Sequence, residues 1–544
     1  MLYLKNNFIK SFKNLLQEEK KPVYMVGAGA LITTILLIIV MYVYVPLGVD
    51  GGLYSYPALS LSRNSDPGES QQSAKELQDI NGVKASFGYD VSRTVRIIPM
   101  SWWFKIFGAG IWSAKAFGII EMLILFTMVY LLLRKISGNK FIVLLCWLLY
   151  LTDTNIIRVG SSNLRPDLML TIMTLAVFLL IKTGAKKNHL ILYISGILSI
   201  SLLSLIHVTS AVPLAFLISF LITELIVSWN SISKFKKQFY ASLILTGTLS
   251  FIFQKGIMDT LIPTKIPVNF NMDVGDSVVS ILKNGVLPVF EKETGRWSDY
   301  FFLSNSGEFF ALILALVLFI VFLFRHSTKE KILARISIPV GCLSAIGVLA
   351  LDPHPWADHA IPIVPFFFLI LCKELELTPS PGIKNLSRSL LLLLTIVAVG
   401  LLAAFSGKFI TYSIKEKYSE SAVIELMDEI FKNKEKHYTV VGPTELWPYI
   451  NPDVNVTIID TIRGNRWAKS DFNGEIDYVI LNNDFAIYDW ESNLRLKYPN
   501  IVLKTVGEVG NAETDWFFVK VMKPVNLNNN NYWQSALQRY LDTK

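Results

Sequence analysis

The sequence predicts a polytopic α-helical membrane protein with a smaller α/β domain at its C-terminal end, and three observations lead to this fold class. Hydrophobic residues make up 52% of the 544-residue chain and charged residues 17%, with a mean hydropathy of +0.44. This composition is far too apolar for a soluble protein of this length. Long apolar runs alternate with loops that contain Lys and Arg, and short β-branched runs replace them near the C-terminus.

The apolar runs are candidates for transmembrane helices, because a helix needs about 20 residues to cross the hydrocarbon core of a bilayer. The first run follows a basic segment, and no convincing small-residue cleavage site follows it, so we interpret it as an uncleaved anchor. By the length criterion the chain has about eleven spans. They cover residues 24–46, 113–133, 141–157, 167–182, 190–206, 210–228, 240–257, 308–324, 334–351, 360–372 and 389–407.

Lys and Arg set the expected orientation, because these residues collect on the cytoplasmic side of membrane proteins. With the N-terminus in the cytoplasm, every second loop falls on that side and is basic. This placement accounts for the net charge of +8 without nucleic acid as a partner. The basic loops lie at residues 134–135, 182–187, 234–237, 325–335 and 373–388.

The same orientation divides the chain into a transmembrane domain, residues 1–408, and an extracytoplasmic α/β domain, residues 409–544. The long first outer loop, residues 47–112, contains the aromatic stretch Pro99–Lys105, which suits a helix lying in the membrane interface. In the C-terminal domain a helical stretch, 421–434, precedes runs that are typical of strands. These runs cover residues 437–441, 454–459, 478–481, 501–506 and 516–521.

Neither cysteine nor metal chemistry has a diagnostic pattern in this sequence. Cys146, Cys342 and Cys372 lie inside apolar runs, where packing is their expected role. The outer loop from Asp352 to His359 carries carboxylate and imidazole groups that suit a divalent metal ion, and a metal site there is an alternative interpretation. Because its ligand spacing is not diagnostic, we expect no cofactor.

One carboxylate stands directly after the first span, in Asp50-Gly51-Gly52-Leu53-Tyr54. An ionisable side chain at membrane depth requires a partner, a water-filled cavity or a function. The alternative is a structural turn, for which Asp-Gly-Gly is well suited.

Two arginines and a second carboxylate, Arg158, Arg165 and Asp167, lie where the third span ends and the fourth begins. Arg forks are natural partners for phosphate oxygens. The alternative is an ordinary helix start, because Pro166 and Asp167 are typical of a first helical turn. On the same predicted side, His207 stands between two spans, and His354 and His359 precede the tenth.

Three segments resemble a known family in their order and spacing. They are Asp50–Tyr54, Trp103-Phe104-Lys105-Ile106-Phe107-Gly108 and Asn163-Leu164-Arg165-Pro166-Asp167-Leu168-Met169-Leu170. Together with the topology they resemble the GT-C glycosyltransferases, in the branch of protein O-mannosyltransferases and lipid A aminoarabinose transferases. The resemblance is best over residues 1–230. Members of this branch usually carry Glu where Gly51 stands.

The resemblance implies an inverting transferase in a bacterial or archaeal plasma membrane, acting in the cell envelope without a cofactor. It would move a sugar from a polyprenyl-phosphate donor to a lipid, glycan or protein acceptor on the outer face. The expected catalytic residues are Asp50, as general base, and Asp167. The expected substrate-binding residues are Tyr54, Arg158, Arg165, His207, His354 and His359.

Two other functions use the same general layout. A transporter or flippase of lipid-linked glycans also needs many spans and a few buried charges, but usually places the charges near the bilayer midplane. The polar groups here lie at outer span ends, which favours catalysis on an outer-face lipid. A glycan ligase or polymerase, which moves a whole oligosaccharide from a lipid carrier, remains a further alternative.

Overall fold

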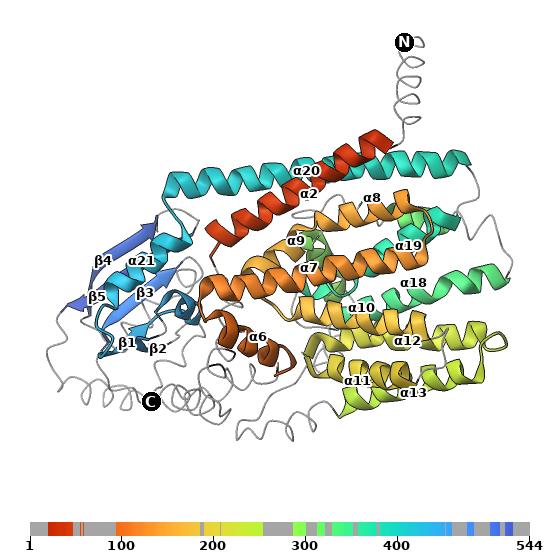
Figure 1. The fold of residues 1–544 in the computed structure, drawn as a ribbon, viewed down its shortest axis with the longest axis horizontal. Helices are drawn as coiled ribbons and strands as arrows, with labels where there is room; N and C mark the ends of the chain where they lie inside the picture. Colours follow the sequence, from red (N-terminus) through yellow and green to blue (C-terminus); the bar gives the residue numbers. More distant parts are fainter. Residues whose placement is uncertain are drawn as a thin grey trace, which may run out of the picture.

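Helices form most of the structure, a computed structural model, and a small mixed sheet lies at one end of them (Figure 1). The structure describes residues 20–46, 55, 58, 62, 94–184, 190–206, 208–253, 287–300, 310, 313–320, 329–351, 357–377, 381–451, 453–459, 476–482, 501–511 and 517–525.

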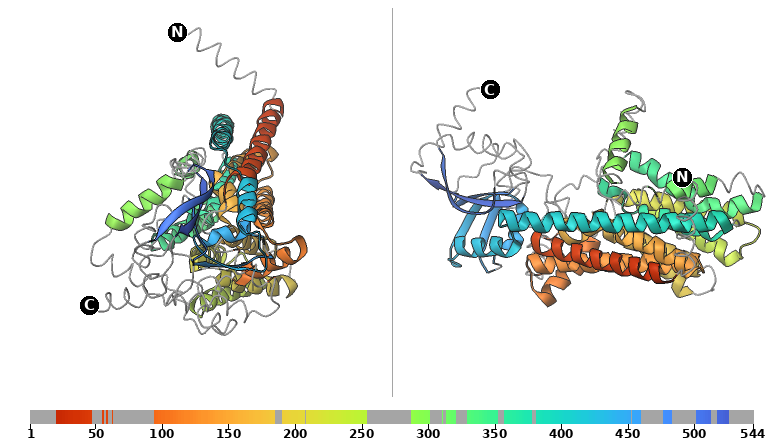
Figure 2. Two further views of the ribbon diagram at one scale, coloured as in Figure 1. Left: turned by 90° about the vertical axis from the view of Figure 1, so that its left-hand side faces the viewer. Right: turned by 90° about the horizontal axis from the view of Figure 1, so that it is seen from above.

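The main helices run roughly along the long axis of the molecule (Figures 1 and 2). Most of them coincide with apolar runs of the sequence. Their bounds are α2 (Lys20–Tyr44), α6 (Thr94–Phe107), α7 (Ile111–Ile136), α8 (Lys140–Leu151), α9 (Thr154–Arg158), α10 (Asp167–Gly184), α11 (Leu190–Ile206), α12 (Ala211–Ser228), α13 (Lys234–Ile252), α16 (Leu287–Ser298), α18 (Lys329–Ala350), α19 (Val364–Leu377), α20 (Pro381–Glu416) and α21 (Glu420–Ile430). Short π or 3-10 segments are η1 (Val159–Asn163), η2 (Val208–Ser210), η4 (Ala357–Ala360) and η5 (Thr444–Tyr449).

Several described helices are able to cross a membrane. Four helical stretches, Met25–Tyr44, Ile111–Ile136, Ala211–Ser228 and Pro381–Ile430, are long and apolar enough by themselves. A fifth crossing results if the pair Lys140–Leu151 and Thr154–Ser162, which is bent by 52°, counts as one. This criterion supports a mostly helical membrane protein with four or five candidate spans among the described residues, fewer than the sequence predicts.

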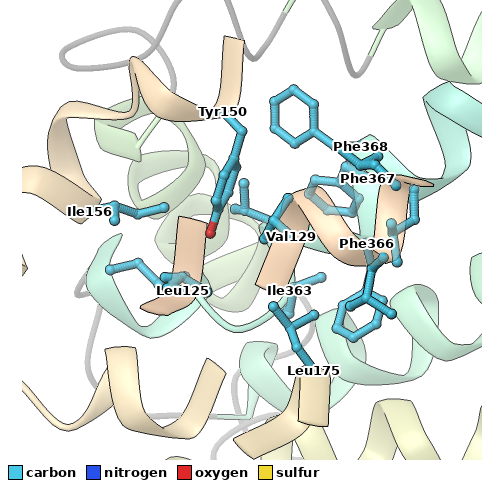
Figure 3. Packing of buried hydrophobic residues seen from close by; sticks show 14 of the residues in the cluster. Leu125, Val129, Tyr150, Ile156, Leu175, Ile363, Phe366, Phe367 and Phe368 are labelled. Carbon is cyan, nitrogen blue, oxygen red and sulfur yellow. The ribbon is translucent and has the colours of Figure 1, made fainter. Parts of the chain in front are cut away.

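The helices bury one large apolar core. Its centre, drawn in Figure 3, joins Tyr150 of α8, Phe368 of α19 and Leu125 of α7. The Tyr150 and Phe368 rings meet edge to face with their centroids 5.5 Å apart, an arrangement that aromatic pairs prefer. Helix α2 lies along α20 and α8, so the first and last long apolar helices are neighbours in space.

The C-terminal part contains a five-stranded sheet with strand order β2-β1-β3-β5-β4. Strand β1 pairs in parallel with β2 on one side and with β3 on the other. Strand β5 pairs antiparallel with both β3 and β4. All five predicted strands and the preceding helix are confirmed within a few residues. The strand bounds are β1 (His437–Val441), β2 (Asn455–Ile459), β3 (Tyr478–Asn482), β4 (Val502–Gly510) and β5 (Phe518–Val525).

A second apolar cluster joins this sheet to the helices. Met100 and Phe104 of α6 and Phe117 of α7 belong to the same buried cluster as Met427 of α21 and Val440 of β1. Helix α20 continues to Glu416 without a break and reaches the end of the molecule where α21 and the sheet lie (Figure 2, right). The sheet is therefore docked on one end of the helices. The domain division at residues 408 and 409 falls inside α20 and stays a prediction.

Helix α6 contains the aromatic stretch that the sequence assigns to the membrane interface. Met100 and Phe104 are buried, whereas Trp102 and Phe107 are 62% and 61% exposed. One face thus packs on the protein and the other presents large apolar side chains, which is the pattern expected for a helix at the surface of a bilayer.

Candidate active site

The backbone between α8 and α10 turns twice, and these turns position the first charged residues. Helix α8 ends at Leu151, and the Asp153 carboxylate then accepts a hydrogen bond of 3.0 Å from the Ile156 amide to cap α9. The chain continues as the π-helical turn η1 and leaves it through Leu164, whose φ is 48°. Such turns are often found at functional sites. Here the turns place Arg158 before η1 and Arg165 after it.

A close approach between two glycines holds η1 against α7. A Cβ atom on Gly118 would lie 2.1 Å from the carbonyl oxygen of Gly160, and one on Gly160 would lie 3.0 Å from the Cβ of Met122. Because no larger residue fits at the first position, glycine is what lets the backbone of η1 approach the helix.

The two arginines meet one carboxylate from a distant part of the chain. Arg158 Nη2 donates to Asp358 Oδ1 at 2.6 Å, and Arg165 Nη1 donates to Asp358 Oδ2 at 3.3 Å. Asp358 belongs to η4, which directly precedes the α19 region of the core. The Asp358 carboxylate therefore connects the segment between α8 and α10 with the segment that leads into α19.

Arg165 has two further partners. Its Nε donates to Asp167 Oδ2 at 3.1 Å, and its Nη2 lies 2.8 Å from His359 Nε2. A guanidinium has only donors, so the His359 ring nitrogen is the acceptor in this contact. In this arrangement the two arginines face two carboxylates and one imidazole.

Burial separates the members of this cluster into two kinds. Arg165, Asp167, Asp358 and His359 are all buried, whereas the Arg158 side chain is 39% exposed. Among the described residues, Asp167 Oδ1 has no hydrogen-bond partner although it is buried. Arg158 is thus the member that can meet an anion from outside, and the buried members hold its partner Asp358 in place.

Helix α16 and the residues after it support the cluster from two sides. Lys292 Nζ donates to the Ala350 carbonyl at 2.8 Å and Arg296 Nη1 to the Leu349 carbonyl at 2.7 Å, so both cap the end of α18. The Tyr300 hydroxyl donates to Asp153 Oδ2 at 2.5 Å. The same segment therefore holds the end of α18, from which the chain leads toward η4, and the cap of the helix that carries Arg158.

The sequence-predicted site residues fall into two groups. The structure brings Arg158, Arg165, Asp167 and His359 together in one cluster. Asp50, Tyr54, His207 and His354 lie outside the described residues, and their predicted roles stay predictions.

Sequence reasoning missed three members of the arrangement, Asp358, Asp153 and Tyr300. A signal for Asp153 does exist, because Asp153-Thr154 directly after an apolar run is the pattern of a helix N-cap. The sequence singles out the outer loop that contains Asp358, but nothing local distinguishes this carboxylate from Asp352. Tyr300 is one of several aromatic residues in its loop and carries no signal of its own.

A divalent metal is the alternative use of the loop that ends at His359. Within the described part of the chain, no group of three or more His, Cys, Asp or Glu side chains is arranged to hold a metal ion. The observed partners of Asp358 and His359 are arginines, which would repel a cation.

Two crystal structures of ArnT from Cupriavidus metallidurans are similar to this chain over nearly their whole length. The structure bound to undecaprenyl phosphate has a TM-score of 0.53 and 11% sequence identity, and the apo structure has 0.53 and 12%. In both comparisons the match covers 92% of this chain and 97% of ArnT. The chain therefore has the fold of ArnT. Four of its described helical stretches are long and apolar enough to cross a membrane.

The apo oligosaccharyltransferase from Archaeoglobus fulgidus is a further match, with a TM-score of 0.48 and 10% identity over 86% of this chain and 70% of that one. No protein-family model and no curated protein sequence matches the chain. The TM-score of 0.53 establishes a fold in common with ArnT, whereas the sequence identity is only 11%. Substrates therefore have to be inferred from the chemistry of the site.

Proposed function

We propose that this protein is an inverting glycosyltransferase that moves a sugar from a polyprenyl-phosphate donor to an acceptor on the outer face of the membrane. The observation that carries the proposal is the cluster of Arg158, Arg165, Asp358 and His359 in a chain with the ArnT fold. Lipid, glycan and protein acceptors all supply the hydroxyl that this reaction needs.

The arginine cluster supports the phosphate end of the reaction. When the sugar leaves, negative charge grows on the polyprenyl phosphate, and a guanidinium fork stabilises such oxygens by charge-assisted hydrogen bonds. Arg158 is the exposed arginine of the cluster and already has its Nη2 fixed by Asp358 at 2.6 Å. ArnT itself was crystallised with undecaprenyl phosphate. We assign the phosphate contact to Arg158, with Arg165 and His359 beside it.

The other end of the reaction needs a base, and we assign it to Asp50. The acceptor hydroxyl loses its proton to the Asp50 carboxylate while its oxygen bonds to the anomeric carbon. The bond between that carbon and the phosphate oxygen breaks, and polyprenyl phosphate leaves with the electron pair. Attack from the face opposite the leaving group inverts the anomeric configuration. Tyr54, His207 and His354 are assigned to substrate binding on the same side.

Asp167 is proposed as the second carboxylate of the site. One of its oxygens is held by Arg165 at 3.1 Å, and the other has no partner among the described residues. A buried carboxylate oxygen is costly unless it accepts a hydrogen bond. A hydroxyl of the bound sugar would supply the missing donor.

The proposed topology has about eleven spans, a cytoplasmic N-terminus and an extracytoplasmic C-terminal domain. It is supported by the alternate basic loops of the sequence and by the position of the sheet at one end of the helices. Labelling of single cysteines introduced into the sheet tests it, because only an outer domain reacts with a membrane-impermeant reagent in intact cells. Labelling from the cytoplasmic side alone would reverse the orientation.

Transfer by the purified protein is the test of the function. In lipid nanodiscs, labelled sugars on short polyprenyl phosphates should be released from the lipid with inverted configuration in the presence of acceptor extracts. A parallel experiment in liposomes measures movement of the intact labelled lipid between leaflets. Lipid movement without cleavage of the sugar-phosphate bond would replace the transferase by a flippase.

A further inference from the structure

The side chain of Lys115, in the first turns of α7, is completely buried and contacts the C-terminal end of another helix, α2. Its Nζ donates to the carbonyl oxygens of Met41 at 3.3 Å and of Tyr42 at 3.0 Å, and also to that of Val45. The last carbonyls of a helix have no partner within the helix, and a cation is favoured there. Lys115 thus caps the C-terminal end of α2.

The fourth partner of Lys115 comes from the C-terminal part of the chain. Glu420 Oε1 accepts from Lys115 Nζ at 2.6 Å, and both side chains are completely buried. Glu420 stands in the first turn of α21, after Ser419, whose hydroxyl caps the helix by accepting from the Ala422 amide at 3.1 Å. A carboxylate is favoured at this helix end. One ammonium group therefore ties the end of α2 to the start of α21.

Stability alone gives little reason for this pair. Removing two charges from water is expensive, and well-packed apolar residues in place of a buried ion pair are often as stable or more so. The apolar cluster that contains Phe117 and Met427 already docks the C-terminal domain on the helices. The pair instead fixes an orientation. Because the Lys115 ammonium has four oxygen partners from the end of α2 and from α21, it determines how the end of α2 lies relative to α21.

We propose that Lys115 and Glu420 are positioning residues that set the end of α2 against the C-terminal domain, and that the action of the proposed base Asp50, which follows α2 in the sequence, depends on them. The inference rests on the proposed function, since Asp50 follows Val45 by only five positions in the sequence. The C-terminal domain thereby has a part in catalysis through the end of α2. Tyr42 holds the same end of α2 against α7, because its hydroxyl donates to the Trp112 carbonyl at 3.1 Å.

The test compares Lys115→Met with the parent in two measurements. Hydrogen exchange of the peptide that covers residues 41–46 should become faster, because the carbonyl cap of α2 is lost. In the transfer assay kcat should fall about 10- to 100-fold, as expected for a misplaced base, whereas KM for the donor should stay within about twofold. Glu420→Gln keeps the size of the side chain and should show both changes to a smaller degree.

Arg335→Met is the matched control. Arg335 Nη1 pairs with Glu374 at 2.9 Å, and this buried pair joins α18 and α19 away from α2. Its loss should leave exchange at residues 41–46 and kcat near parental values. Unchanged exchange in Lys115→Met, or faster exchange with parental kcat, would overturn the inference. The exchange result does not depend on glycosyl transfer, so failure of the proposed function and failure of the positioning role are distinguishable.

Discussion

Arg165 and His359 lie 194 positions apart in the sequence, yet their Nη2 and Nε2 atoms are 2.8 Å apart. The arginine follows the π turn η1, and the histidine belongs to the short helix η4. Their contact shows that the third apolar run ends close to where the tenth begins. In this contact the guanidinium donates and the histidine ring nitrogen accepts.

The first prediction concerns the exposed arginine. Arg158→Ala removes a charge-assisted contact to the donor phosphate, so the Kd for polyprenyl phosphate should rise about 10- to 100-fold. The thermal unfolding temperature should change little, because Asp358 keeps Arg165 as a partner at 3.3 Å. Calorimetric titration of polyprenyl phosphate into nanodiscs measures the affinity. Parental affinity in the folded variant would exclude Arg158 as the phosphate contact.

Arg165→Ala should behave differently, because Arg165 is buried and has three partners. Removing Arg165 takes a positive partner away from two buried carboxylates, Asp167 and Asp358. The free energy of unfolding should therefore fall by about 3–5 kcal/mol. Donor affinity should fall as well, because Asp358 and His359 lose their common partner. Thermal unfolding of Arg165→Ala and Arg158→Ala, measured side by side, compares their stabilities. Equal stability of the two variants would contradict a structural role for Arg165 that Arg158 lacks.

Tyr300→Phe tests the support that the segment after α16 gives to the site. The change removes only the hydroxyl that donates to Asp153 Oδ2 at 2.5 Å. The free energy of unfolding should fall by about 1.5–3 kcal/mol, the usual range for a hydrogen bond to a charged group. Asp153→Asn and the double variant complete a cycle. Additive effects of the two single changes would mean that the residues act independently.

Gly118→Ala tests the contact that positions η1. A Cβ here would lie 2.1 Å from the Gly160 carbonyl oxygen, so η1 has to move, at a cost of about 1–3 kcal/mol. Donor affinity should decrease with stability, because Arg158 directly precedes η1. Gly347→Ala in α18 is the control, since nothing lies within 4 Å of its added Cβ. Equal stability and equal donor affinity of Gly118→Ala and Gly347→Ala would show that the glycine contact does not position η1.

Much of the fold is predictable because it depends on local patterns. The apolar runs give the long helices, and short β-branched runs give all five strands of the sheet within a few residues. The sheet order is not predictable in this way. Placing β5 between β3 and β4 depends on pairing between segments such as Val479 and Met522, which no local pattern encodes.

The candidate site is predictable only in part for the same reason. Arg158, Arg165 and Asp167 are close in sequence, so their residue types at one span end already indicate a charged site. Asp358 joins them across 200 positions, and the contact appears only when the helices are packed. In the sequence, Lys115 is a single charge inside an apolar run, with nothing nearby to indicate its partners. In the structure these partners are backbone carbonyls of α2 and a glutamate 305 positions away.

The role of Asp50 is tested by the rate of sugar transfer from polyprenyl phosphate by purified Asp50→Asn and parent protein under the same conditions. Asn keeps the size of Asp and much of its hydrogen bonding but takes no proton. If Asp50 is the general base, turnover should fall by about 10²–10⁴-fold, the usual contribution of such a group, while the Kd for the donor lipid changes little. A structural Asp in an Asp-Gly-Gly turn would tolerate Asn, so near-parental turnover by Asp50→Asn would show that Asp50 is not the base.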